Sequence, residues 1–396
     1  MKQNVLNRIK TITGNTVRQI VVATCSMMIP FLVIRFTSIE IWGALVSILL
    51  YVLLATSVVN WGSKEYLLRM FSEMPSKINV QFSQNTATRA PLVVLFSMVA
   101  LLLFPVHYFL WIFLWLTGRF LLHSSEVLVL FEKKFQKTIV VEVSSFLIFC
   151  VVLYLFRYQI DLYLLLIFYS TYQFLKGLFY FLIFKNVFSF SEICFQKTFF
   201  VKASSFFGLT ILGFLGSKID LYIVAYFLEN KTLGNYQIIN SLLIFVMSIS
   251  AFIYAPFTKN MYRTTDEFLG KVKKIIIYIG LIIVPISLLV VYFAINYFLN
   301  QKFGIAFYVI AFMYVFAPFV YGIDVVKLLK QKKQQKVIII SALIVFVNFI
   351  CSTLFLMIKP EICSALAGSA VAQITGLVLF IRVENKSENF KNKLVL

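Results

Sequence analysis

The stretch IIIYIGLIIVPISLLVVYFAINYF (275–298) carries no charge and is long enough to cross the hydrocarbon core of a bilayer as a helix. Similar apolar runs recur along the chain, separated by short polar segments. They occupy 17–36, 41–60, 90–106, 108–130, 139–156, 160–184, 199–225, 234–257, 275–298, 304–326, 337–358 and 361–381. Because the runs are continuous rather than alternating, they favour helices over a transmembrane β-barrel. The sequence predicts an all-α membrane protein with twelve transmembrane helices.

The composition excludes several other classes of protein. Of the 396 residues, 61% are hydrophobic and only 13% are charged, with a mean hydropathy of +0.92. A soluble enzyme, an extracellular disulfide scaffold or a disordered chain needs far more polar residues. The five cysteines show no metal-binding spacing, so disulfides, metals and cofactors are not expected. The basic N-terminus precedes an apolar run without a cleavage site, which we interpret as the first spanning helix.

The net charge of +20 sets the expected topology. In a soluble protein it would suggest nucleic acid, but here the basic residues cluster between apolar runs, so no nucleic-acid partner is expected. If the N-terminus is cytoplasmic, the basic residues on the outer side are Arg35, Arg157, Lys231, Lys302 and Lys359. Those at membrane depth are Arg119, Lys176 and Lys218. All the others, Arg89 among them, fall on the cytoplasmic side, so the pattern predicts a multi-pass protein with both termini in the cytoplasm.

Two pairs of segments suggest an internal repeat. RFTSIEIWGALVSILL (35–50) and YFLENKTLGNYQIINS (226–241) each contain an outer loop that ends at a glycine opening the next helix. EKKFQK (132–137) and QKKQQK (331–336) form the second pair, and nearly the same number of residues separates them as separates the first pair. This spacing predicts two pseudo-symmetric six-helix bundles, 1–190 and 191–396. An even number of helices per half gives both halves the same orientation, as in transporters with a central cavity.

The segment LGFLGSKIDLYIVAYFLENKTLGNYQIINSLL (212–243) resembles the polysaccharide transporters of the MOP superfamily. In that family the corresponding helix carries an aspartate, followed by an outer loop and a Gly-x-Tyr that opens the next helix. Asp220, Gly234 and Tyr236 stand at those places. Further matching features are Arg35, Gly43, the turn 60–62, Pro256 and FGIAFYV (303–309).

The resemblance implies a Wzx-type flippase for O-antigen, capsule or related surface polysaccharide. Such a protein moves undecaprenyl-diphosphate-linked oligosaccharide across the bacterial cytoplasmic (inner) membrane by alternating access. The partners it implies are that lipid-linked oligosaccharide, membrane lipid, a polysaccharide polymerase and a chain-length regulator. It implies no catalytic residues, because transport makes and breaks no covalent bond.

A diphosphate-linked sugar needs fixed cations in a wet cavity, so charged residues at membrane depth are the candidate site. Arg119, His123 and Glu126 are spaced i, i+4, i+7 and share one helical face. Arg119 is expected to bind phosphate in a bidentate manner, and His123 with Glu126 to couple transport to protons. The alternative is a cluster of ion pairs that only braces neighbouring helices.

Lys218 and Asp220 lie in the middle of one apolar run and point about 160° apart on an ideal helix. We expect Lys218 to face the cavity as a substrate-binding cation. Asp220 is expected to be a polar cavity residue or to pair with a basic group on a neighbouring helix. A structural pair between helices is the alternative interpretation.

Lys176 is the third expected substrate-binding cation. Gln173, Tyr169 and Tyr172 lie near it on the same helix and form a polar, aromatic stripe suited to a sugar or a phosphate. The alternative is a lysine that snorkels toward the cytoplasm. Asp324, close to the end of its run, is expected to face water.

Two other function classes are open. A multidrug or cation antiporter of the same fold would need a cavity rich in carboxylates, whereas the depth residues identified are three basic and two acidic. A membrane polymerase or acyltransferase would show a large basic outer loop or motifs such as HxxxxD or GxSxG, and neither occurs. We therefore expect a transporter and not an enzyme.

Overall fold

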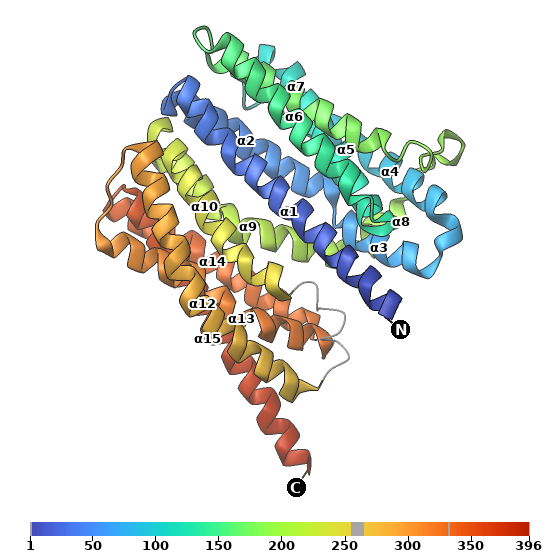
Figure 1. The fold of residues 1–396 in the computed structure, drawn as a ribbon, viewed down its shortest axis with the longest axis vertical. Helices are drawn as coiled ribbons and strands as arrows, with labels where there is room; N and C mark the ends of the chain where they lie inside the picture. The colour runs from blue at the N-terminus through green and yellow to red at the C-terminus, as the bar shows by residue number, and fades with distance from the viewer. Residues whose placement is uncertain (1, 255–264, 332, 396) are drawn as a thin grey trace. The chain divides into compact units, whose positions relative to one another are not determined.

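The computed structural model describes residues 2–254, 265–331 and 333–395, in which only helices and their connections occur. Eleven helices of this described part are long and apolar enough to span a membrane (Figure 1). The prediction of an all-α membrane protein is therefore confirmed. The chain divides into two compact units, Met1–Ile211 and Leu212–Leu396. The division at residue 190 stays a prediction, and Pro256 lies outside the described residues.

Unit 1 contains the first half of the long helices and two short ones. They are α1 (Lys2–Phe36), α2 (Ile39–Asn60), α3 (Ser63–Glu73), α4 (Ile78–Ala100), α5 (Phe109–Glu132), α6 (Phe135–Phe156), α7 (Leu162–Leu182) and α8 (Lys197–Lys202). Helix α9 (Ser204–Phe227) begins in unit 1 and continues into unit 2. Side-chain caps begin two of the helices: Ser38 accepts from the Ile41 N–H, and Asp161 accepts from the Leu164 N–H at 2.7 Å.

Unit 2 contains the remaining long helices. They are the rest of α9, then α10 (Asn230–Tyr254), α12 (Asp266–Ala294), α13 (Ile305–Lys330), α14 (Gln334–Ile358) and α15 (Ile362–Val395). A π-helical turn, Ile295–Leu299, ends the long α12. Helices α14 and α15 pack closely because Gly368 faces Ser352, whose Oγ would lie 2.3 Å from a Cβ at that glycine.

The third expected run, 90–106, is wrong in its bounds, because α4 spans Ile78–Ala100. Its first half, INVQFSQNTATR, is too polar to be recognised as a spanning segment from hydropathy. The structure buries much of this polar half inside unit 1, including Asn85, Thr88 and Arg89. Helix α4 therefore begins twelve residues before its apolar run, because protein rather than lipid surrounds its polar residues.

A sharp break separates α2 from α3. Trp61 and Gly62 both adopt left-handed conformations, with φ of 44° and 64°. A Cβ on Gly62 would lie 2.6 Å from the Phe207 backbone nitrogen, so no other residue fits without movement. The Trp61 indole stacks on Phe207 at 4.1 Å and donates to the Phe200 carbonyl at 3.0 Å. The break therefore anchors the start of α9 to the end of α2.

Two glycines bring α5 and α7 into backbone contact. A Cβ on Gly177 would lie 2.0 Å from the Gly118 carbonyl oxygen, and a Cβ on Gly118 would lie 2.4 Å from the Gln173 carbonyl oxygen. The helices can meet this closely only because neither glycine has a side chain. Arg119 follows Gly118 directly, so this crossing places it beside the polar stripe of α7.

Candidate functional site

The candidate site in unit 1 lies where α5, α6 and α7 meet. Trp115, one turn before Arg119 on α5, packs edge-on against Tyr169 of α7 at 4.7 Å between ring centroids. Phe149 of α6 contacts both Tyr169 and Tyr172, at 5.9 and 5.0 Å. These rings form an aromatic wall beside the Gly118–Gly177 crossing.

Arg119 is a cation without an ion-pair partner among the residues that the structure describes. Its Nε is buried and makes no hydrogen bond there. Glu142 and Glu126 act on it electrostatically, but neither carboxylate contacts it. Two neighbouring polar atoms on α7, Gln173 Oε1 and Ser170 Oγ, are also buried without a hydrogen-bond partner. Buried donors and acceptors of this kind are costly to leave unpaired, which is typical of a binding site.

His123 and Glu126 lie next to one another on α5, as expected, with His123 Nδ1 3.7 Å from Glu126 Oε2. Two cations from other helices also reach Glu126. Lys64 Nζ of α3 is 3.1 Å from its Oε1, and Arg18 of α1 is 3.6 Å from the same oxygen. His123 Nε2 is buried without a hydrogen-bond partner among the described residues. Glu126 therefore joins α1, α3 and α5, whereas Arg119 has no ion-pair partner in the part of the chain that the structure describes.

Lys176 is buried and does not snorkel. Its Nζ lies 3.4 Å from Glu142 Oε2 of α6 and 3.3 Å from the Tyr172 hydroxyl. The Tyr180 hydroxyl donates to Glu142 Oε1 at 3.0 Å. The positive charge of Lys176 is therefore balanced by a carboxylate, in contrast to that of Arg119.

Glu142 is a site residue that sequence reasoning missed. It lies within the apolar run 139–156, and it is 1% exposed. The signal was present, because a lone carboxylate at membrane depth is a functional candidate by default. Counting Glu142 gives three acidic residues against the three basic residues identified from the sequence, and this balance by itself does not argue against an antiporter.

Arg89 is the second missed residue, and its expected place among the cytoplasmic loops is wrong. It is fully buried at the middle of α4, with Nε 2.9 Å from Asn85 Oδ1 and NH2 2.9 Å from Ser124 Oγ. NH1 lies 3.4 Å from Asn60 Oδ1, and the guanidinium sits 5.1 Å from the Phe120 ring centroid. All these partners are neutral, so no described residue places a counter-charge in direct contact with this cation.

Unit 2 has a separate polar cluster around Asp220 of α9. Asp220 Oδ2 accepts from the Tyr236 hydroxyl at 2.5 Å, Asn240 Nδ2 at 2.9 Å and Ser369 Oγ at 3.0 Å. Lys218 Nζ donates to Asn240 Oδ1 at 3.4 Å, so Asn240 bridges the two charged residues. Lys218 and Asp220 are therefore not direct partners, as expected from their spacing.

Asp324 does not face water, contrary to expectation. It is 1% exposed, and Lys273 Nζ of α12 lies 2.7 Å from its Oδ2. Lys273 also contacts Glu384 of α15 at 2.9 Å, and Lys327 pairs with Glu384. Hydropathy could not show this pairing, because the four charged residues lie on three different helices, α12, α13 and α15.

Groups of three or more histidine, cysteine, aspartate or glutamate side chains suited to a metal do not occur in the described residues. The interior of each unit instead offers hydrogen-bond donors, cations and aromatic rings. Such a set can hold an anionic or sugar-bearing ligand without covalent chemistry.

Comparison with known proteins finds similar folds only among solved structures. No protein-family model and no curated protein matches the chain. Among solved structures, the chain is similar to an inward-facing multidrug resistance MATE family transporter of the MOP superfamily, with a TM-score of 0.61, 9% identity and 95% of each chain covered. It is also similar to a eukaryotic MATE transporter, AtDTX14, with a TM-score of 0.59 and 12% identity over 96% of this chain and 95% of that one.

The matches also include the lipid II flippase MurJ in an inward closed conformation, with a TM-score of 0.43 and 13% identity over 96% of this chain and 86% of that one. The assignment of the fold rests on the two MATE structures, whose TM-scores are 0.61 and 0.59. At their level of identity the likeness extends to the fold, and nearly the whole length of each chain takes part. The chain is therefore a multi-pass membrane protein whose fold is like that of the MATE transporters.

Proposed function

We propose that the protein flips undecaprenyl-diphosphate-linked oligosaccharide across the bacterial cytoplasmic membrane by alternating access, for assembly of O-antigen, capsule or a related surface polysaccharide. A transporter fold supports movement of a solute across a membrane. The choice of an anionic lipid-linked sugar rests on the charges inside the units. A polysaccharide polymerase and a chain-length regulator are the proposed protein partners.

The observation that carries the proposal is that the buried carboxylates have partners, whereas Arg119 has no ion-pair partner among the described residues. Each carboxylate buried in the described residues is already engaged: Glu142 by Lys176, Asp220 by three side-chain donors, and Asp324 by Lys273. Arg119 has no such partner. A free guanidinium is complementary to a diphosphate, whereas a cationic drug would need a free carboxylate.

The aromatic wall supports the sugar part of the substrate. Trp115, Tyr169 and Tyr172 lie on the same side of unit 1 as Arg119, and sugars pack their C–H faces on such rings. Gln173 adds an amide with a free acceptor. When the phosphate of the substrate binds Arg119, the attached sugar can therefore contact the aromatic wall and Gln173.

The other candidate residues are proposed to bind substrate or to couple transport to an ion. Lys218, whose bonded partner is the neutral Asn240, is a further substrate-binding cation in unit 2. Lys176 is proposed to bind substrate as well, as part of its ion pair with Glu142. His123, Glu126 and Asp220 are the candidates for ion coupling.

A gene deletion tests the proposal. We expect the deletion strain to lose surface polysaccharide while lipid-linked repeat units accumulate on the cytoplasmic face, and the plasmid-borne gene to restore export. Multidrug export is the competing function, because one of the similar structures is a multidrug resistance MATE family transporter. A strain with normal polysaccharide and altered drug resistance would support that alternative, and a strain that makes no repeat unit would indicate an enzyme.

A further inference from the structure

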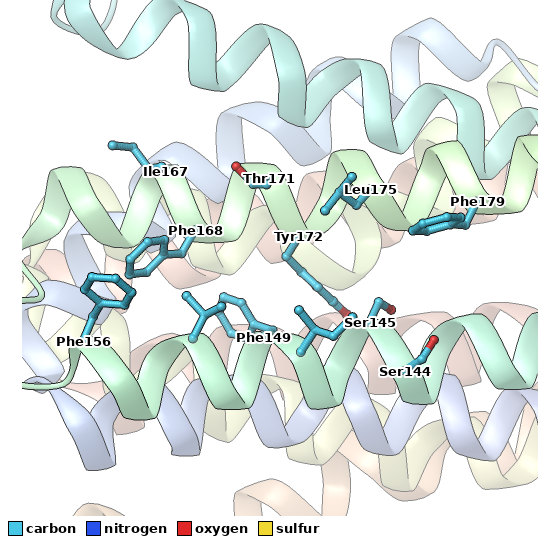
Figure 2. Close-up of a pocket in the computed structure, with 12 residues that line it drawn as sticks. Ser144, Ser145, Phe149, Phe156, Ile167, Phe168, Thr171, Tyr172, Leu175 and Phe179 are labelled. Atoms are coloured by element: carbon cyan, nitrogen blue, oxygen red, sulfur yellow. The ribbon is translucent and has the colours of Figure 1, made fainter.

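A long apolar groove runs between α6 and α7 and encloses a cavity of about 420 Å³. Figure 2 shows that residues of both helices line it from end to end. Along α7 it extends from Ile167 to Phe179, a rise of about 18 Å, which is more than half of a hydrocarbon core of about 30 Å. Ile148 and Phe179 on its walls are 59% and 48% exposed. In a membrane-spanning pair of helices such a groove is suited to a hydrocarbon chain.

The few polar side chains that line this groove lie at the middle of the two helices. Tyr172, the central residue of α7, reaches toward Ser145 near the centre of α6 (Figure 2). The Tyr172 ring lines the groove, and its hydroxyl contacts Lys176 Nζ at 3.3 Å. Tyr172 also packs near Tyr169, on the wall that borders Arg119. The apolar groove and the candidate site around Arg119 therefore share one residue, Tyr172.

This arrangement distinguishes between two kinds of lipid. A resident phospholipid keeps its headgroup at the membrane interface, so a groove for its chain needs no polar side chains at mid-height. A lipid that is being transported brings its headgroup to mid-height while its tail stays in hydrocarbon. Only the second kind places a phosphate beside Tyr172 and Arg119 with its chain in the groove.

We propose that the α6–α7 groove holds the polyprenyl tail of the lipid whose diphosphate binds at Arg119. The proposal rests on the proposed function and adds the place and the chemistry of tail recognition. Tyr172 forms the boundary between the tail groove and the headgroup site.

Photo-crosslinking tests the tail groove in the full-length protein in lipid nanodiscs. The probe is undecaprenyl phosphate with a benzophenone near the middle of its tail. We expect the label in peptides 144–156 and 167–179, with competition by undecaprenyl phosphate and not by an equal amount of phosphatidylglycerol. Equal competition by phosphatidylglycerol would make the groove a site for bulk lipid and overturn the proposal.

Two tryptophan variants provide a matched test. Ile148→Trp fills the groove and should reduce labelling of these peptides by roughly an order of magnitude. Val151→Trp is the control, because Val151 is 57% exposed on the same helix and does not line the groove. Unchanged labelling in Ile148→Trp would overturn the proposal.

The total probe retained by the protein separates failure of the groove from failure of the proposed function. If the protein retains the probe but the label falls on other helices, the groove is wrong while the proposed substrate class stands. If no probe is retained at any concentration at which the nanodisc lipid is in excess, the proposed substrate class itself is wrong.

Discussion

At the scale of single residues, the contrast between Arg119 and Lys176 gives opposite expectations. Arg119 has no ion-pair partner among the described residues, so its loss leaves no carboxylate uncompensated. We expect Arg119→Ala to abolish most export at normal abundance in the membrane, and Arg119→Lys to keep part of it because charge remains without fork geometry. Polysaccharide on the cell surface and immunoblots of membranes measure the two quantities. Normal export by Arg119→Ala would remove this residue from the mechanism.

Lys176→Met should behave differently, because it leaves the buried Glu142 carboxylate without the positive charge of Lys176. Breaking a buried pair from one side costs about 3–5 kcal/mol, so abundance and melting temperature in detergent should fall. The double variant Lys176→Met with Glu142→Gln removes both charges and should recover most of the loss. A single variant as stable as the parent would show that the pair has no structural role.

At the scale of helices, the α5–α7 crossing is the element that places the site. A Cβ on Gly177 meets the Gly118 carbonyl oxygen at 2.0 Å, so Gly177→Ala must separate the helices. We expect lower melting temperature and weaker export. Gly208→Ala is the control, because a Cβ there has nothing within 4 Å among the described atoms. Equal behaviour of the two variants would mean that the close crossing is dispensable.

The helices also show how far sequence reasoning reaches. Long apolar runs identify most spans, because lipid contact demands them. The polar first half of α4 is not recognised from the sequence, because hydropathy measures only how well a segment suits contact with lipid. That half is buried in protein instead. The face shared by His123 and Glu126 follows from helical spacing, whereas the partners Lys64 and Arg18 come from other helices. Such tertiary pairing cannot be derived from periodicity within one segment.

At the scale of the whole molecule, the charge pattern predicts topology. Reporter fusions after Lys77, Lys137, Lys202, Lys271, Lys336 and at the C-terminus should indicate the cytoplasm. Fusions near Glu40, Gln159, Lys231, Lys302 and Lys359 should indicate the outside. Two adjacent loops with exchanged signals would remove a pair of spans and contradict a twelve-helix arrangement.

The buried polar half of α4 has a consequence for biogenesis. An arginine at the centre of a lone helix costs roughly 2.5–3.5 kcal/mol on translocon insertion scales, and the amides around Arg89 add to that cost. Two of the contacts that compensate it, Ser124 and Phe120, belong to α5, which the ribosome makes later. Helix α4 should therefore leave the translocon only together with α5, as a hairpin. A chain truncated after Phe104 and released from the ribosome should keep this helix inserted less often than one truncated after Glu132 and released.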